Sequence, residues 1–144
     1  MTAHLTPTQT AGRALFARGM SGPVVMLNLL RFRAIADYSA APDLAPVDPI
    51  SGAEAFDRYI AHTLPFLSES GGSLVFLGDA DGFLIGPETE RWDCAMLVRQ
   101  ASLAAFMAFD TNPAYRAGLG HRTAALCDSR LLPLAERGVR QPAA

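Results

Sequence analysis

The sequence of 144 residues contains no lysine, and its 12 basic residues are all arginine. GC-rich codon usage is the simpler explanation of this composition, and a functional preference for guanidinium groups is the alternative. The arginines are scattered along the chain, and the formal net charge is −2. A protein that binds nucleic acid usually carries a cluster of basic residues that neutralises phosphates. The charge pattern therefore predicts no nucleic-acid partner.

Cysteine is also scarce, since only Cys94 and Cys127 are present and they are far apart. A structural zinc site needs more ligands at closer spacing. Both cysteines have apolar sequence neighbours, which favours buried free thiols in a reducing cytoplasm. The N-terminus lacks a charged segment followed by an apolar leader, and no apolar run approaches the roughly 20 residues of a membrane span. We therefore expect a cytoplasmic protein with no membrane partner.

Motifs for metals, nucleotides and hydrolytic triads are missing as well. No glycine-rich phosphate loop, GxSxG motif or HExxH motif occurs, and no two histidines are four residues apart. Each of these motifs places the groups that its chemistry needs at a fixed spacing. The sequence therefore predicts neither a cofactor nor a metal site.

The chain does have ample apolar material for a core, with 50% hydrophobic and 18% charged residues. Two segments, residues 24–31 and 92–99, are largely apolar runs that end in arginine. In the first segment apolar residues occupy both strand parities, and Asn28 is the single polar residue in its middle. Strands that are covered on both faces show this pattern. We therefore expect both segments to be central strands of a sheet.

Capping residues and apolar spacing predict the other elements. A helix should begin at Thr6-Pro7 and end near Arg18, and a strand should cover residues 24–33. The proline-rich residues 36–50 form either a functional loop or an ordinary insertion. The later elements are a helix from Ser51 to Gly71-Gly72 that is kinked at Pro65, a strand at 73–78, a short strand or hairpin arm at 83–86, a strand at 92–99, a helix from Ser102, a helix from Asn112 through Leu126 and a strand at 129–134.

After the N-terminal helix this order is βαββαβ, which indicates an α+β ferredoxin-like fold with helices on one face of an antiparallel sheet. The other face would be bare in a single chain, although its residues are apolar. Leaving it in water would forfeit about 25 cal/mol per Å² of apolar surface. We therefore expect a homodimer whose two sheets face each other. The expected organisation is an N-terminal helical extension at 1–21, a ferredoxin-like domain at 22–135 and a C-terminal tail at 136–144.

Several segments together resemble the domain-of-unknown-function 1330 family (DUF1330). They are residues 23–33, Gly71-Gly72, Asn112-Pro113-Ala114-Tyr115, His121-Arg122 and Asp128-Ser129-Arg130-Leu131. The resemblance covers residues 22–135 and implies a dimeric α/β barrel, in a superfamily that includes cofactor-independent oxygenases and lactone isomerases. One position departs from the pattern, because Ile85 stands before Gly86 where many members have glutamate. Any role of that carboxylate is absent here or has moved.

Polar residues within these elements are the candidates for a small-molecule site between the sheet and the helices. The expected substrate-binding residues are Asn28, Arg31, Trp92, Asp93, Tyr115 and Arg122, and the expected catalytic residues are His62 and Tyr59. Asn28 must have a hydrogen-bond partner when it is buried, which is either a neighbouring loop or a ligand. Arg31 has the opposite strand parity, so it shares this site only if the strand twists or ends before it.

Each candidate also has a structural interpretation. Arg31 and Arg122 could form ion pairs instead of anchoring a carboxylate or an enolate. His62 could be a solvated or structural histidine, although imidazole is in general the best-suited acid or base near neutral pH. Trp92 could belong to the core or to the dimer interface, and Tyr59 and Tyr115 to the edge of the core.

Three functions remain open from the sequence. The first is an enzyme that acts on a small acidic or aromatic metabolite without metal or nucleotide, with arginine or asparagine holding an oxyanion. The second is a binding or stress-response module without turnover. The third, haem handling, needs His62 or His121 as an axial ligand. A pocket residue with a shifted pKa would favour the enzyme, and a purely apolar pocket would favour the binding module.

Overall fold

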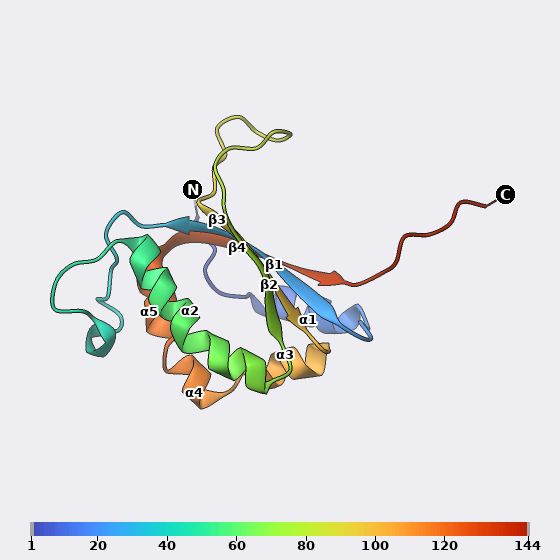
Figure 1. The fold of residues 1–144 in the computed structure, drawn as a ribbon, viewed down its shortest axis with the longest axis horizontal. Coiled ribbons are helices and arrows are strands. Elements are labelled where there is room, and N and C mark those ends of the chain that lie inside the picture. The colour runs from blue at the N-terminus through green and yellow to red at the C-terminus, as the bar shows by residue number, and fades with distance from the viewer. Residues whose placement is uncertain (1, 144) are drawn as a thin grey trace.

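The computed structural model describes residues 2–143 (Figure 1). Its four strands form one antiparallel sheet in the order β2-β3-β1-β4. The strands are β1 Val24–Phe32, β2 Ser73–Asp79, β3 Cys94–Gln100 and β4 Leu126–Ala135. The helices are α1 Gln9–Ala17, α2 Gly52–Glu69, α3 Leu103–Asp110, α4 Pro113–Arg116 and α5 Leu119–Ala125, and η1 is a 3-10 helix at Pro42–Leu44. The α+β ferredoxin-like fold predicted from the βαββαβ order is confirmed.

The sheet is covered by helices on one side only. Helices α2, α4 and α5 lie on that side, and the opposite side is open (Figure 1). β1 and β3 are the two central strands, as the apolar runs predicted. Along β1 the residues from Val24 to Leu30 alternate between buried and half-buried. The buried set, which includes Asn28 and Leu30, faces the helices, and we call this side of the sheet the inner face.

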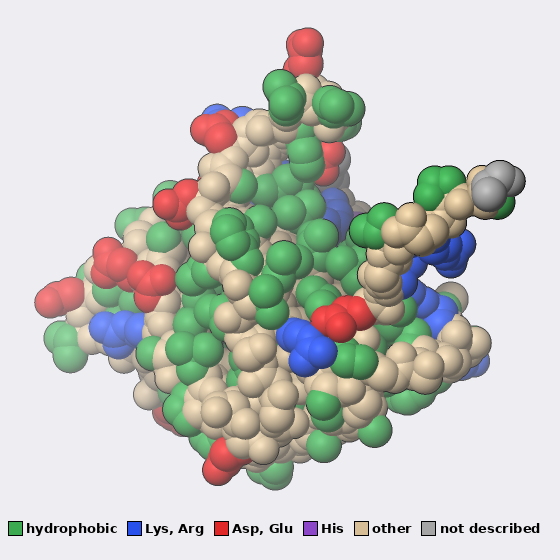
Figure 2. Space-filling view, turned by 45° about the vertical axis from the view of Figure 1, so that its right-hand side comes forward, with side chains coloured by type: hydrophobic (Ala, Val, Ile, Leu, Met, Phe, Trp, Pro, Cys, Tyr) green, Lys and Arg blue, Asp and Glu red, His purple; other side chains and the backbone are tan. Residues whose placement is uncertain are grey.

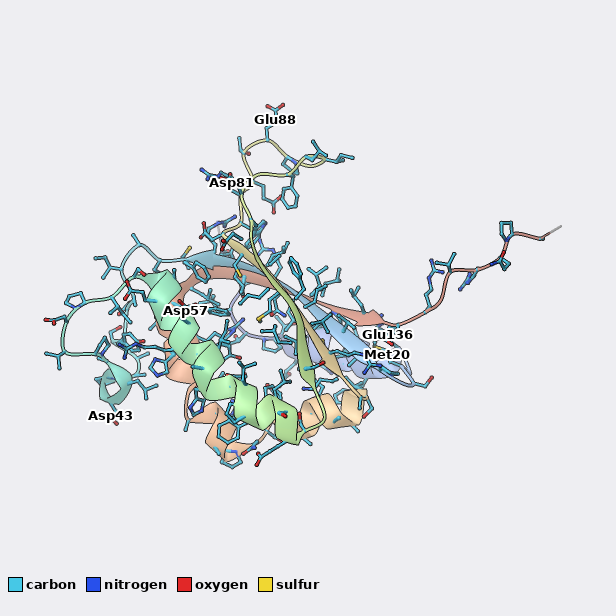
Figure 3. All side chains as sticks on the ribbon, viewed as in Figure 1. Met20, Asp43, Asp57, Asp81, Glu88 and Glu136 are labelled. Carbon is cyan, nitrogen blue, oxygen red and sulfur yellow. The ribbon has the colours of Figure 1, made fainter. Side chains whose placement is uncertain are left out.

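The hydrophobic core lies between the inner face and the helices. Ser51 caps α2 by accepting a hydrogen bond from the Glu54 amide, as the sequence predicted. The helix then buries one stripe of residues against the sheet, comprising Ala55, Phe56, Tyr59, Thr63 and Leu67. Leu30, Cys94 and Met96 meet this stripe from the strands. Side chains fill the space between the sheet and α2 (Figure 3), and each large apolar one contributes about 1.5–3 kcal/mol on burial.

The other side of the sheet, here called the open face, is apolar. The register places Leu27 of β1 between Leu97 of β3 and Leu132 of β4, and Phe76 of β2 beside Leu97. Leu132 and Phe76 remain 55% and 54% exposed. Figure 2 turns this side toward the viewer and shows hydrophobic side chains gathered over the body of the molecule. In the single chain, water therefore reaches the face that the apolar pattern of the sequence predicted to be covered.

Residues 80–93 form an arm between β2 and β3 that stands away from the sheet (Figure 1). Arg91 holds its base through two hydrogen bonds to the Asp81 carboxylate, of 2.8 and 2.9 Å. Asp81 lies at the base of the arm and Glu88 near its tip (Figure 3). Of the two alternatives expected at residues 83–86, the short strand is wrong, because an isolated bridge from Gly82 to Arg91 is the pairing found there, and these residues belong to the arm instead.

Some predicted boundaries need correction. α1 is capped by Thr8, which accepts a hydrogen bond from the Ala11 amide, and not by Thr6. β3 begins at Cys94, because Trp92 and Asp93 belong to the base of the arm. Pro65 lies inside α2, which continues to Glu69.

The segment predicted as one helix from Asn112 through Leu126 is divided. Asn112 caps α4 as predicted, but α4 ends at Arg116 and α5 begins at Leu119. Leu126 is the first residue of β4, where it pairs with Phe32 of β1. Pairing with the neighbouring strand thus overrides the helical spacing of the sequence at this position.

The loop at residues 36–50 is ordered against α5. The Asp37 amide donates to the Ala124 carbonyl at 2.9 Å, and the Tyr38 hydroxyl lies 2.8 Å from His121 Nδ1. Residues 136–143 have no regular secondary structure and lead away from the body (Figure 1). Among residues 2–143, none of the helices combines the length and the apolar character that crossing a membrane requires.

Candidate functional site

Two of the predicted site residues meet in the inner layer of the fold. The hydroxyl oxygens of Tyr59 on α2 and Tyr115 on α4 are 2.6 Å apart, and both side chains are buried. Burial raises the pKa of Tyr115, and the hydrogen bond with Tyr59 raises it further. The Tyr115 phenol therefore stays protonated. Because one hydroxyl donates to the other, the accepting hydroxyl keeps its own hydrogen available for a third group.

Asn28 lies on the same side of the sheet, in the middle of β1. It is 6% exposed and stands between Met96 of β3 and Leu131 of β4. Its Nδ2 donates to the carbonyl oxygen of Met26 on the same strand, at 3.2 Å. No other hydrogen bond of this side chain is found within residues 2–143, so the amide retains unused donor and acceptor capacity.

Thr63 is a residue of the inner layer that the sequence analysis missed. It follows Tyr59 by one helical turn on the buried stripe of α2. Its Oγ1 atom is buried and makes no hydrogen bond with any described residue. Most buried polar atoms have a partner, so the Thr63 hydroxyl, like Arg33 Nε and Gln100 Nε2, is an exception among the described residues. The sequence signal was weak, because threonine is common on the edges of helical stripes.

His62 ties α2 to α4. Its Nε2 atom lies 2.9 Å from the Ala114 carbonyl oxygen and 3.2 Å from that of Tyr115. Since carbonyl oxygens only accept, Nε2 carries the hydrogen and Nδ1 is the acceptor. A β-carbon on Gly118 would overlap the imidazole ring, so glycine at that position lets His62 approach the backbone. Any proton transfer by His62 would have to use Nδ1.

Arg122 on α5 borders the same layer from the side of β4. Its guanidinium donates to the Leu5 carbonyl oxygen at 2.8 Å and to Ser129 Oγ at 3.4 Å. Its positive charge acts on Tyr115, where it opposes the rise in pKa that burial causes. Asn28, Tyr59 and Tyr115 are thus buried on the helix side of the sheet, and His62 and Arg122 are half-buried on α2 and α5; we call these five the inner residues.

The other predicted residues form a separate cluster at the end of β1. The Arg31 guanidinium lies 4.3 Å from the centre of the Trp92 ring, and the Arg130 guanidinium lies 5.0 Å from it. Arg31 also donates to the Arg91 carbonyl oxygen and pairs with Asp128 at 3.3 Å. Asp93 accepts a hydrogen bond from the Phe32 amide at 2.7 Å. By strand parity Arg31 and Arg130 belong to the open face.

This geometry corrects the expectation of one pocket that contains all the candidates. Arg31 and Trp92 contact each other, but they do not meet Asn28, because β1 keeps its regular alternation as far as Leu30. The strand parity in the sequence had already separated Arg31 from Asn28. Asp128 and Arg130, which complete the cluster, were recognised only as part of a motif.

A third group of polar residues lies beneath the loop at 36–50. Burial lowers the pKa of His121 and raises that of Tyr38, and the two side chains are hydrogen-bonded. A hollow of about 260 Å³ opens beside Tyr38, between Ile35 and Ile50. None of the predicted site residues lines it. Within the described part of the chain, no three His, Cys, Asp or Glu side chains are grouped so that they could hold a metal ion.

Comparison with known proteins finds close similarity to one solved protein. The methylated RPA0582 protein matches with a TM-score of 0.81 and 36% sequence identity, over 96% of this chain and 98% of that chain. The RPA0582 protein of unknown function from Rhodopseudomonas palustris matches with a TM-score of 0.79 and 36% identity, over 96% and 100% of the two chains.

A more distant match is a dimeric protein of unknown function with a ferredoxin-like fold from Bacteroides fragilis. Its TM-score is 0.49 at 14% identity, over 81% of this chain and 99% of that chain. No family model matches the sequence, and no curated protein does. At 36% identity over nearly the whole length, the chain belongs to the same family as the RPA0582 protein.

Proposed function

We propose that this member of the RPA0582 family binds a small acidic or aromatic metabolite between the inner face of its sheet and helices α2, α4 and α5. The observation that carries the proposal is the buried Thr63 hydroxyl, which has no partner among the described residues. Leaving such a group unpaired costs about 1–3 kcal/mol. A ligand with polar groups would remove this cost, and Asn28 offers further donor and acceptor capacity on the facing strand.

Each inner residue would make a different kind of contact with the ligand. Arg122 would hold a carboxylate or enolate oxygen, since a guanidinium makes short, charge-assisted hydrogen bonds with anions. The Tyr59–Tyr115 pair would donate its remaining hydrogen to a neutral or anionic oxygen. Aromatic side chains of the core, such as Phe56 and Phe109, would contact the apolar part of the ligand.

If the bound metabolite is turned over, the protein is an enzyme of the oxygenase or isomerase type that uses neither metal nor nucleotide. Its proton carrier would be His62, through Nδ1, or the tyrosine pair. The alternative is a binding or stress-response module without turnover. The raised pKa of Tyr115 suits a hydrogen-bond donor better than a base, which favours oxyanion binding in either case. Haem handling would need the remaining ring nitrogen of His62 or His121 as the axial ligand, and neither histidine lines the hollow beside Tyr38.

The homodimer with facing sheets is part of the same proposal. The open face has an apolar centre, with Leu27, Leu97 and Leu132 in register. Ion pairs flank this centre, namely Arg99–Glu136 at 2.6 Å at one end and Arg31–Asp128 at 3.3 Å at the other. An apolar centre within a polar rim is typical of protein interfaces. We also retain DUF1330 membership, on the strength of the sequence motifs, and a cytoplasmic location, because both cysteines are free thiols.

Native mass spectrometry of freshly purified protein, compared with its denatured mass, tests both parts. A dimer that carries extra mass would support the site and supply the ligand for identification. A clean dimer would support the interface alone, and turnover screening would follow. A monomer would contradict the facing sheets.

Variants of the inner residues then locate the ligand. Asn28→Ala and Arg122→Ala should each lose the extra mass, whereas Thr123→Ala, at an exposed position of the same helix as Arg122, should keep it. Retention of the ligand in both inner variants would contradict the proposed site.

A further inference from the structure

The N-terminal residues 2–7, here called the strap, lie across the start of β4. The His4 amide donates to Asp128 Oδ1 at 2.8 Å, and the Ser129 hydroxyl donates to the His4 carbonyl oxygen. The Leu5 carbonyl oxygen accepts the hydrogen bond from Arg122 at 2.8 Å. The Leu5 side chain packs against the hydrophobic core. The strap therefore covers the Arg122 side of the inner layer.

The strap is held by a preformed set of polar groups, which we call the β4 niche and define as Arg122, Asp128 and Ser129. Asp128 and Ser129 are 8% and 5% exposed. Arg31 and Arg130 fix the Asp128 carboxylate by ion pairs of 3.3 and 2.8 Å. Burial raises the pKa of Asp128, but hydrogen bonds from His4, Arg130 and Ser129 outweigh this effect and leave the pKa below its ordinary value. Asp128, whose charge is compensated by Arg31 and Arg130, thus holds the strap through the His4 amide, whereas the Ser129 hydroxyl and the Arg122 guanidinium are donors that an anion could use.

The strap is an imperfect partner for the guanidinium. A neutral backbone carbonyl binds arginine more weakly than a carboxylate, which can accept two parallel hydrogen bonds. Here one terminal nitrogen of Arg122 meets Leu5, and the other makes only a 3.4 Å contact with Ser129 Oγ. A ligand carboxylate in place of the Leu5 carbonyl would use both nitrogens and gain the charge interaction.

Beyond these contacts at residues 4 and 5, the N-terminal extension is weakly attached to the rest of the fold. α1, which follows the strap, has no buried residue. The extension has one further side-chain hydrogen bond to the sheet, from Arg18 to the Pro133 carbonyl oxygen at 2.9 Å. Segments with few buried contacts open locally without global unfolding.

We propose that the donors of the β4 niche, Arg122 and Ser129, are the carboxylate-binding end of the inner site, and that the strap is a displaceable plug which a carboxylate ligand replaces. This inference rests on the proposed function, since Arg122 belongs to both. It narrows the ligand to a metabolite with a carboxylate at one end and an apolar or aromatic body that reaches inward from Arg122.

Benzoate is a suitable probe, with uncharged benzamide as its matched control. Binding is measured by isothermal titration calorimetry on the full chain, on a variant lacking residues 2–5, and on Leu5→Gly in case the deletion impairs folding. A tethered segment competes at an effective concentration in the millimolar range. Both strap variants should therefore bind benzoate at least tenfold more tightly than the full chain, and benzamide more weakly than benzoate.

Two controls separate the possible results. Arg18→Ala loosens the extension away from the niche and should leave the affinity unchanged. Arg122→Gln in the deleted chain should abolish the gain. If the full chain and both strap variants bound benzoate with equal affinity, the strap would not compete with the ligand, and the proposed site itself would still stand. Absence of benzoate binding in every variant, with no ligand found by native mass spectrometry, would overturn the site as well.

Discussion

Replacing Thr63 by valine removes one hydroxyl from the inner layer and leaves the shape of the side chain almost unchanged. The Oγ1 atom is buried and has no hydrogen-bond partner among residues 2–143. Since an unpaired buried polar group costs about 1–3 kcal/mol, Thr63→Val should raise the free energy of unfolding of the ligand-free protein by about 1 kcal/mol. Threonine and valine have similar helix propensities, so α2 itself should be little affected.

Urea denaturation followed by circular dichroism measures this change in the free energy of unfolding. For a domain of this size, a gain of about 1 kcal/mol raises the Tm by about 3 °C. The same variant should bind the native ligand less tightly, because the hydroxyl that the ligand pairs with is gone. Thr123→Val, at an exposed position of α5, is the matched control and should change the free energy of unfolding by less than about 0.5 kcal/mol.

The opposite sign would refute this reasoning. If Thr63→Val lost more than about 1 kcal/mol while Thr123→Val was neutral, the Thr63 hydroxyl would have a partner inside the folded protein. The proposed function would then lose its main support, which is the unpartnered Thr63 hydroxyl.

Three other predictions concern the open face, the strap and the tyrosine pair. Leu132→Glu should convert the dimer to a monomer in light-scattering chromatography, because it buries a charge in the apolar interface; an unchanged dimer would place the interface elsewhere. Because the folded-state pKa of Asp128 is lowered from 3.8, its bond to the His4 amide holds above that pH and weakens as the pH falls through the folded-state value. The protection of the His4 amide against hydrogen exchange, measured relative to its intrinsic rate, should therefore fall in acid, and Asp128→Asn should remove that pH dependence. Tyr115→Phe should cost about 1–2 kcal/mol in urea denaturation; no loss of stability would mean that the hydroxyl pair contributes nothing.

Much of the fold follows from local signals in the sequence. Ser51, Ser102 and Asn112 each cap a helix as predicted, because the capping hydrogen bond joins residues two or three positions apart. The central positions of β1 and β3 followed from their apolar parity, since a strand with neighbours on both sides and both faces covered has no place for polar alternation. Leu126 was misassigned because pairing with Phe32, far away in the chain, decides its conformation.

The candidate site was only partly predictable. Asn28, Tyr59 and Tyr115 were found because each is a polar group within an apolar pattern, and they do lie in the inner layer. The grouping of Arg31 and Trp92 with them failed, since the arm folds back and places Trp92 against Arg31 and Arg130. Thr63 gave only a weak signal, because the surrounding tertiary structure decides whether a buried hydroxyl has a hydrogen-bond partner.

The sequence by itself determined the order of the elements, the two-sided apolar character of the central strands and the presence of a polar residue at their centre. These properties depend on the spacing of neighbouring residues and on the period of the strand. Only the tertiary structure decided that β1 keeps its alternation as far as Leu30 and so keeps Arg31 away from Asn28, and that residues 2–7 lie against Arg122, Asp128 and Ser129. Such contacts join segments more than 100 positions apart in the chain, and no local pattern records them.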